Sequence, residues 1–104
     1  MNGKVRTADV GLLYDPARSG ELQLSARWKA MLARALPWAR VRRNYPYAGS
    51  DDGFMPYLRG RFRPADYIGV EIEFNQAHAL GAPRRFKALR AAVVGSLRAA
   101  LTSE

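Results

Sequence analysis

The chain has 104 residues, which is room for a single domain spanning 1–104. Hydrophobic residues make up 48% and charged residues 25%, a composition typical of a folded protein and not of a disordered one. The net charge is +8, cysteine is absent and His78 is the single histidine, so disulfides, cysteine nucleophiles and a zinc site with several histidine ligands are excluded for this chain alone.

Apolar runs and turn residues predict the elements of the first half of the chain. Residues 9–14 form a short apolar run that indicates a buried strand, closed by a turn at Pro16. Apolar residues then recur at helical spacing over 21–36, and Pro37 ends that helix. Alternating residues predict a second, short strand over 38–42.

The second half alternates in the same way. Residues 44–53 concentrate turn-forming residues and predict a loop, followed by a short helix over 53–61. The clearest strand is predicted over 67–75, and the last helix over 83–101. Strands and helices that alternate along a chain predict an α/β fold, here a small, mainly parallel sheet flanked by helices.

Two carboxylates in the third predicted strand are the main candidate for chemistry. Successive side chains of a strand point to opposite faces, so Glu71 and Glu73 share one face with Asn75, at roughly 6.5–7 Å spacing. Two carboxylates so close in a cleft suit general acid/base catalysis. The alternative is an edge strand whose acidic face lies in solvent or pairs with arginines.

Three segments together resemble the C-terminal part of the N-formylglutamate amidohydrolase family. They read ADVGLLYD at 8–15, RNYPYAG at 43–49 with DGF at 52–54, and GVEIEFNQ at 69–76. The resemblance extends over most of the chain, from about 2 to 101. It implies a phosphorylase/hydrolase-like α/β fold, similar to that of the zinc carboxypeptidases, and zinc-dependent hydrolysis of the amide bond of an N-acyl amino acid.

The resemblance also implies that this chain is truncated. The family's zinc ligands, histidines and a glutamate, come from an N-terminal half that this chain lacks. We therefore expect no metal ligands and no zinc in this chain alone, and no activity without the missing half. The missing contacts would come from one of two sources. One is the missing half, supplied as a separate chain, and the other is self-association through the exposed edges of a small sheet.

Roles for particular residues follow from the same resemblance. The Glu-aliphatic-Arg pattern of carboxypeptidase-like strands implies that Glu73 is the catalytic base, although Asn75 stands where that pattern has arginine; Glu71 is the second catalytic candidate. In such a mechanism zinc activates a water, and the glutamate takes its proton and passes it to the leaving amine.

Substrate binding is assigned to residues near the middle of the chain. Asn44 and Tyr47 lie in the loop that faces the substrate by the same analogy, and Arg42 and Arg43 are candidates to bind the substrate's carboxylates.

The basic charge leaves one alternative function. A basic module that binds RNA or a protein partner would lose affinity steeply as salt rises. The basic residues are spread along the chain and no RNA-binding motif surrounds the tyrosines, so nucleic acid is not the partner we expect. No stretch approaches the roughly 20 apolar residues of a membrane span, and the first residues lack the apolar run of a secretory signal. We expect a cytoplasmic protein without a membrane partner.

Overall fold

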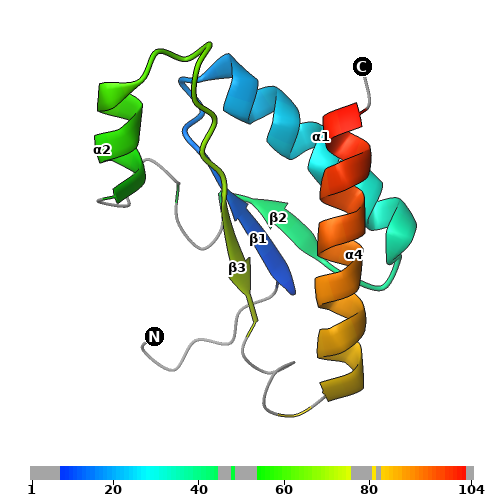
Figure 1. Ribbon diagram of the computed structural model, residues 1–104. Helices are drawn as coiled ribbons and strands as arrows, with labels where there is room; N and C mark the ends of the chain where they lie inside the picture. Colours follow the sequence, from blue (N-terminus) through cyan, green and yellow to red (C-terminus); the bar gives the residue numbers. More distant parts are fainter. Residues whose placement is uncertain (1–7, 45–47, 49–53, 76–80, 82, 103–104) are drawn as a thin grey trace.

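Strands and helices alternate along the chain in a computed structural model, as Figure 1 shows. The structure describes residues 8–44, 48, 54–75, 81 and 83–102. Its elements are β1 (Val10–Leu13), α1 (Ser19–Ala35), β2 (Val41–Arg43), α2 (Phe54–Arg61), β3 (Glu71–Phe74) and α4 (Pro83–Thr102). The predicted α/β alternation is confirmed.

The second and third predicted strands differ most from the structure in their bounds. The predicted strand over 38–42 is wrong in its first part, because residues 37–40 form a turn that leads into β2. The carboxylate of Asp9 holds this turn by accepting a hydrogen bond of 2.6 Å from the backbone amide of Arg40. The third strand is shorter than the predicted 67–75 and covers only the residues that pair with β1.

The sheet is mixed, and this corrects the predicted mainly parallel arrangement. Its strand order is β2-β1-β3; β1 runs parallel to β2 and antiparallel to β3. Strand direction is not contained in the alternation of elements. The connection from Arg43 to Glu71 is long enough to return the chain in either direction, because a parallel crossover needs only about a dozen residues.

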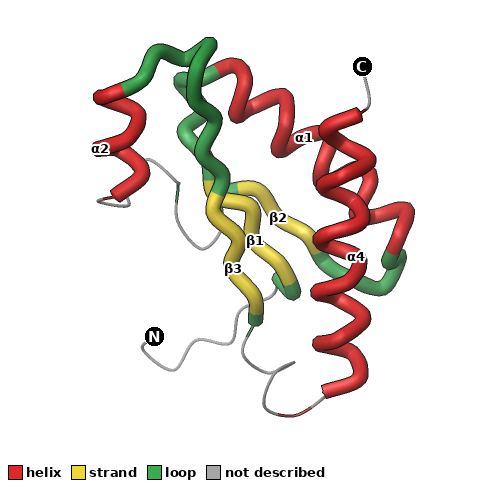
Figure 2. The backbone as a smooth tube through the Cα atoms, in the orientation of Figure 1, coloured by secondary structure: helices red, strands yellow, loops and turns green. Residues whose placement is uncertain are grey.

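Both long helices cover one face of the sheet, as Figure 2 shows. The core between them and the sheet contains Val10, Leu12, Leu24, Trp28, Leu32, Val41, Leu89, Val93 and Ala100. The indole Nε1 of Trp28 donates hydrogen bonds to the backbone oxygen of Val93 (3.2 Å) and to Oγ of Ser96 (3.0 Å), which joins α1 to α4. Among the described residues, no helix has the length and apolar character to span a membrane.

Candidate active site

The sheet face turned away from α1 and α4 carries one row of three residues. Gly11 of β1 lies between Arg42 of β2 and Glu73 of β3 in the sheet register. Because neighbouring strands are about 4.8 Å apart, the α-carbons of Arg42 and Glu73 are separated by about 10 Å. Gly11 has no side chain and is buried, so the row has a cationic group at one end, a carboxylate at the other and no side chain between them.

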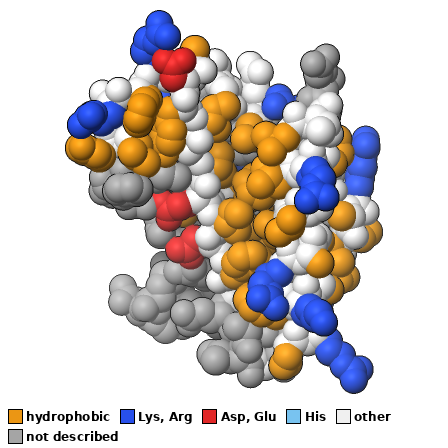
Figure 3. Space-filling model, in the orientation of Figure 1, with side chains coloured by type: hydrophobic (Ala, Val, Ile, Leu, Met, Phe, Trp, Pro, Cys, Tyr) orange, Lys and Arg blue, Asp and Glu red, His pale blue; other side chains and the backbone are white. Residues whose placement is uncertain are grey.

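Glu71 lies on the same face, two residues before Glu73 in β3. It is opposite Leu13, the last residue of β1, and its Oε1 is buried. Figure 3 shows acidic side chains along β3. The predicted sharing of one face by Glu71 and Glu73 is confirmed by this register, since Ile72 and Phe74 pack against the core on the other face.

The direction of β3 determines which of the two glutamates lies nearer the carboxyl ends of the parallel strands. Open α/β sheets bind ligands outside the carboxyl ends of their parallel strands. Since β3 is antiparallel to β1, its own carboxyl end lies at the amino ends of β1 and β2, where Phe74 is opposite Val10. Glu71 is therefore the glutamate nearer the carboxyl ends of the parallel pair. Glu73 is the glutamate in register with Arg42, on the other side of Gly11.

Arg42 and Arg43, both candidates for substrate binding, point to opposite faces of the sheet. Arg43 lies on the helix-covered face, where its guanidinium donates hydrogen bonds to Oγ of Ser25 (3.1 Å) and to the backbone oxygen of Leu22 (2.9 Å). It also lies 4.8 Å from the ring centroid of Tyr14. These contacts attach β2 to α1. Arg42 is exposed on the opposite face.

Asn44 joins the ends of β1 and β2. Its backbone φ of 51° lies in the left-handed region that asparagine tolerates better than most residues. Its backbone N–H donates to the backbone oxygen of Leu12 (2.9 Å), and its side-chain Oδ1 accepts from the backbone N–H of Tyr14 (2.9 Å). Asn44 therefore fixes the edge of the sheet at which the loop begins. Tyr47, the other loop candidate, lies outside the described residues.

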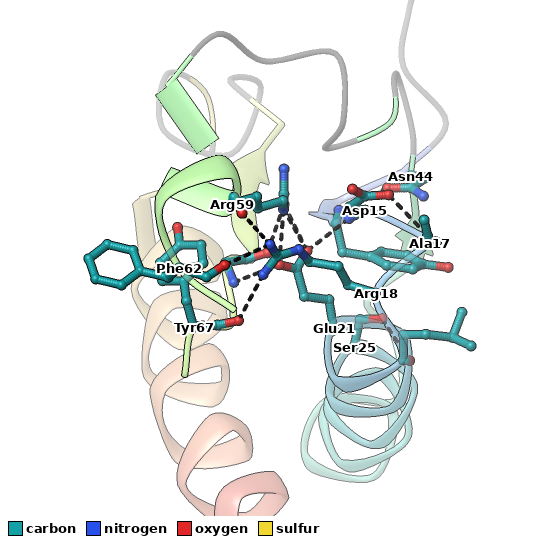
Figure 4. Close-up of polar contacts among 12 residues, drawn as sticks. Asp15, Ala17, Arg18, Glu21, Ser25, Asn44, Arg59, Phe62 and Tyr67 are labelled. Atoms are coloured by element: carbon teal, nitrogen blue, oxygen red, sulfur yellow. Dashed lines mark hydrogen bonds and ion pairs between the residues drawn. The ribbon is translucent and has the colours of Figure 1, made fainter. Parts of the chain in front are cut away.

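A buried ion pair near this edge was not predicted from the sequence. Glu21, in the first turn of α1, is fully buried, and Arg59 of α2 is 7% exposed. Figure 4 shows the two side chains facing each other, with Nη2 of Arg59 2.8 Å from Oε1 of Glu21 and Nε 2.9 Å from Oε2. The glutamate also accepts from the backbone amides of Asp15 (2.9 Å) and Gly69 (3.0 Å).

The pKa values of both partners follow from this geometry. Burial by itself would raise the pKa of Glu21, but the hydrogen bonds from Arg59, Asp15 and Gly69 outweigh it, so its pKa is lowered from the ordinary value of 4.5. Burial would likewise lower the pKa of Arg59, and the Glu21 carboxylate reverses this and raises it. Both groups are therefore charged at neutral pH.

A second arginine extends the cluster to the segment that precedes β3. The guanidinium of Arg18 donates hydrogen bonds to the backbone oxygens of Arg59, Phe62 (3.0 Å) and Tyr67 (3.3 Å), as Figure 4 shows. We call Arg18, Glu21 and Arg59 the polar cluster. It attaches α2 and the approach to β3 to the start of α1, and so it holds the strand that carries both candidate glutamates.

The described residues do not fit a zinc ion. They contain no group of three or more His, Cys, Asp or Glu side chains that could hold a metal. The two candidate glutamates supply at most two carboxylates, whereas a catalytic zinc usually takes three protein ligands. His78 lies outside the described residues. Ligands for zinc would have to come from outside the described residues.

Comparisons with known proteins give one relevant similarity. No family model matches the chain, and no curated protein matches it. Among solved structures, the chain is similar to gene product Atu2144 from Agrobacterium tumefaciens, with 27% sequence identity and a TM-score of 0.64. The similarity covers 99% of this chain and 38% of that chain. This chain therefore spans well under half the length of that neighbour.

Proposed function

We propose that this chain is part of an N-formylglutamate amidohydrolase-like enzyme, which hydrolyses the amide bond of an N-acyl amino acid in the cytoplasm. The observation that carries the proposal is the row formed by Arg42, Gly11 and Glu73 on the sheet face away from the helices. It combines an anion-binding group and a candidate base on either side of Gly11, a buried residue without a side chain.

The dimensions of this row suit an acyl amino acid. The carboxylate of such a substrate is separated from its amide carbon by only a few bonds. A guanidinium binds a carboxylate through two parallel hydrogen bonds, which fixes the orientation of the rest of the substrate. With Arg42 on the carboxylate, the amide is directed toward Glu73, since the two α-carbons are about 10 Å apart.

The chain's residues then have defined roles. The Glu73 carboxylate accepts a proton from the attacking water as the new carbon–oxygen bond forms. The same carboxyl group donates that proton to the amide nitrogen as the carbon–nitrogen bond breaks, which releases a carboxylic acid and a free amine. Arg42 holds the substrate throughout. In the complete enzyme, zinc would polarise the carbonyl and the water.

Binding of N-formyl-L-glutamate to the chain tests this proposal without requiring turnover. We expect the ligand to shift the amide NMR signals of Gly11, Arg42 and Glu73. Arg42→Met should weaken binding roughly 10- to 100-fold, the usual effect of losing a charged hydrogen-bond pair. Arg34→Met removes an exposed arginine from the last turn of α1 and is the matched control. Equal affinity in the two variants, or shifts confined to other elements, would contradict the proposal.

Zinc content is the second expected result. After dialysis against micromolar zinc, the purified chain should retain well under one equivalent, because the described residues do not supply three ligands. Metal analysis of the dialysed protein measures this directly. Retention of one full equivalent, together with turnover of N-formylglutamate by the chain alone, would show that this chain supplies its own zinc ligands.

A further inference from the structure

Lysine and arginine dominate the two helices that cover one face of the sheet. Both helices are fully described, and they contain eight of the chain's 17 basic residues, three in α1 and five in α4. Their single acidic residue, Glu21, is fully buried and paired with Arg59. The basic residues are spread along the sequence, but the fold gathers these eight on one side of the sheet, whereas Glu71 and Glu73 lie on its opposite face.

Three basic residues of α4 lie in a line on the side of the helix turned away from the core. Arg84, Lys87 and Arg98 are exposed, and spacings of three and eleven residues place them on the same side of a helix. At 1.5 Å per residue, the line extends about 21 Å along the helix axis. Figure 3 shows Lys and Arg side chains along α4. None of the three forms an ion pair in the described part of the chain, so their charges are available to a partner.

An aromatic side chain lies beside the first turn of this helix. Trp38, in the turn after α1, is 37% exposed, and the guanidinium of Arg85 lies 4.1 Å from its ring centroid. Aromatic rings and arginine planes are the surfaces on which unpaired bases stack. Because Arg85 follows Arg84, the ring lies near one end of the line of cations. We call Arg84, Arg85, Lys87, Arg98 and Trp38 the α4 basic surface.

The side chains between these cations favour one class of anionic partner. Between Lys87 and Arg98 this side of the helix presents Ala91, Val94 and Gly95, so one valine is the only apolar side chain larger than alanine there. A protein partner or a lipid surface takes much of its binding energy from several apolar side chains. Nucleic acid instead binds mainly through phosphate contacts, and arginine holds a phosphate by two parallel hydrogen bonds. The α4 basic surface therefore suits nucleic acid best.

We propose that the α4 basic surface binds single-stranded nucleic acid. Arg84, Lys87 and Arg98 contact phosphates, and an unpaired base stacks on Trp38. These contacts use charge and a flat ring, which DNA and RNA share, so both bind. The α4 basic surface lies on the helix side of the sheet, opposite the candidate active site, and its binding does not depend on the proposed hydrolase activity.

Fluorescence anisotropy of a labelled oligothymidylate and a labelled oligouridylate tests the proposal on the full chain. We expect both to bind, and the logarithm of the association constant should fall with the logarithm of salt concentration with a slope of about −2, since each of three phosphate contacts on a single strand contributes about −0.7. Binding should shift the NMR signals of the α4 basic surface, including the Trp38 indole. Absence of binding, or shifts confined to other elements, would overturn the proposal. Tighter binding of polyglutamate or of phosphatidylserine vesicles would also overturn it and assign the surface to an acidic protein or a lipid.

Matched double variants separate this surface from the net charge of the chain. Lys87→Gln with Arg98→Gln should weaken oligothymidylate binding roughly tenfold or more and reduce the size of the salt slope by about 1.4, because two phosphate contacts are lost. The control, Arg61→Gln with Arg63→Gln, removes the same charge from exposed positions in and after α2 and should change neither quantity. Equal effects of the two double variants would show that only net charge acts, and would overturn the proposal.

Variants of Trp38 test the stacked base. Trp38→Leu should weaken oligothymidylate binding roughly 5- to 100-fold, the usual effect of losing one stacked base, with little change in the salt slope. Trp38→Phe keeps a ring and should restore most of the affinity. Circular dichroism confirms that each variant is folded. Equal losses in the leucine and phenylalanine variants, or no loss in either, would overturn the stacking role of Trp38.

Discussion

Replacing Glu21 by glutamine should lower the free energy of unfolding by about 3–5 kcal/mol, the usual cost of removing one partner of a buried ion pair. Glutamine preserves the shape of the side chain but leaves the Arg59 guanidinium, 7% exposed, without its countercharge. For a domain of this size, each kcal/mol corresponds to roughly 4–8 °C in Tm. Urea unfolding followed by circular dichroism measures the change.

Asp66→Asn is the matched control for this prediction. Asp66 also forms an ion pair with an arginine, Arg63, at 2.9 Å, but both side chains are largely exposed. Exposed pairs contribute about 0–1 kcal/mol, so this variant should unfold nearly as the wild type does. The double variant Glu21→Gln with Arg59→Met should recover part of the loss, since it leaves no unpaired buried charge. Equal effects of Glu21→Gln and Asp66→Asn would contradict the structural role of the polar cluster.

The same pair predicts how stability depends on pH. Because the pKa of Glu21 is lower in the folded chain than its ordinary 4.5, its stabilising contribution is complete above that value. The contribution is lost as the pH falls through the folded-state pKa, where the carboxylate takes up a proton in the native state too. The wild type should therefore lose more stability than Glu21→Gln between pH 5 and pH 2. Parallel pH profiles would be inconsistent with this assignment.

Glu73→Gln should lower the turnover of N-formylglutamate by roughly 10²–10⁴, the usual contribution of a positioned acid/base group. This result is expected under the proposed function, and its measurement requires an assembly in which further polypeptide supplies the zinc ligands. Glutamine fits the same space but can neither accept the proton of the attacking water nor return it to the leaving amine. Zinc content should not change.

Glu71→Gln is the matched comparison, on the same face of the same strand. We expect it to cost less in turnover and more in stability, because Oε1 of Glu71 is buried. The position of Glu71 near the carboxyl ends of β1 and β2 makes this ranking a sharp test. The reverse ranking would assign the base to Glu71, and unchanged rates in both variants would exclude β3 from the mechanism.

The local sequence pattern was sufficient to predict much of the fold and part of the candidate site. Alternation along the third strand predicted that Glu71 and Glu73 share a face, and the pairing with β1 confirms it. The same kind of alternation misled at Trp38, which lies in a turn, with the Arg85 guanidinium 4.1 Å from its ring centroid. Alternation over only a few residues also occurs in turns, so it identifies short strands poorly.

Features that depend on distant partners could not be predicted. Glu21 is an acidic residue in the first turn of a helix, which helix electrostatics already favours, so nothing in its surroundings indicated burial. Its partner Arg59 lies 38 residues further along the chain, in a different helix. The direction of β3 depends on the path of the long connection from β2. That direction determines which glutamate lies level with Arg42.

The way in which α2 is attached affects how this helix opens locally. Of the α2 residues whose side chains the structure describes, 56–61, none belongs to the hydrophobic core, and the hydrogen bonds of the polar cluster attach this part of the helix. Apolar contacts weaken on cooling, whereas contacts between charged groups do not depend on apolar hydration in this way. Local opening of α2 should therefore respond to acid more than to cold, and separately from the core. Since the cluster also fixes the approach to β3, each opening would release one end of the strand that carries Glu71 and Glu73.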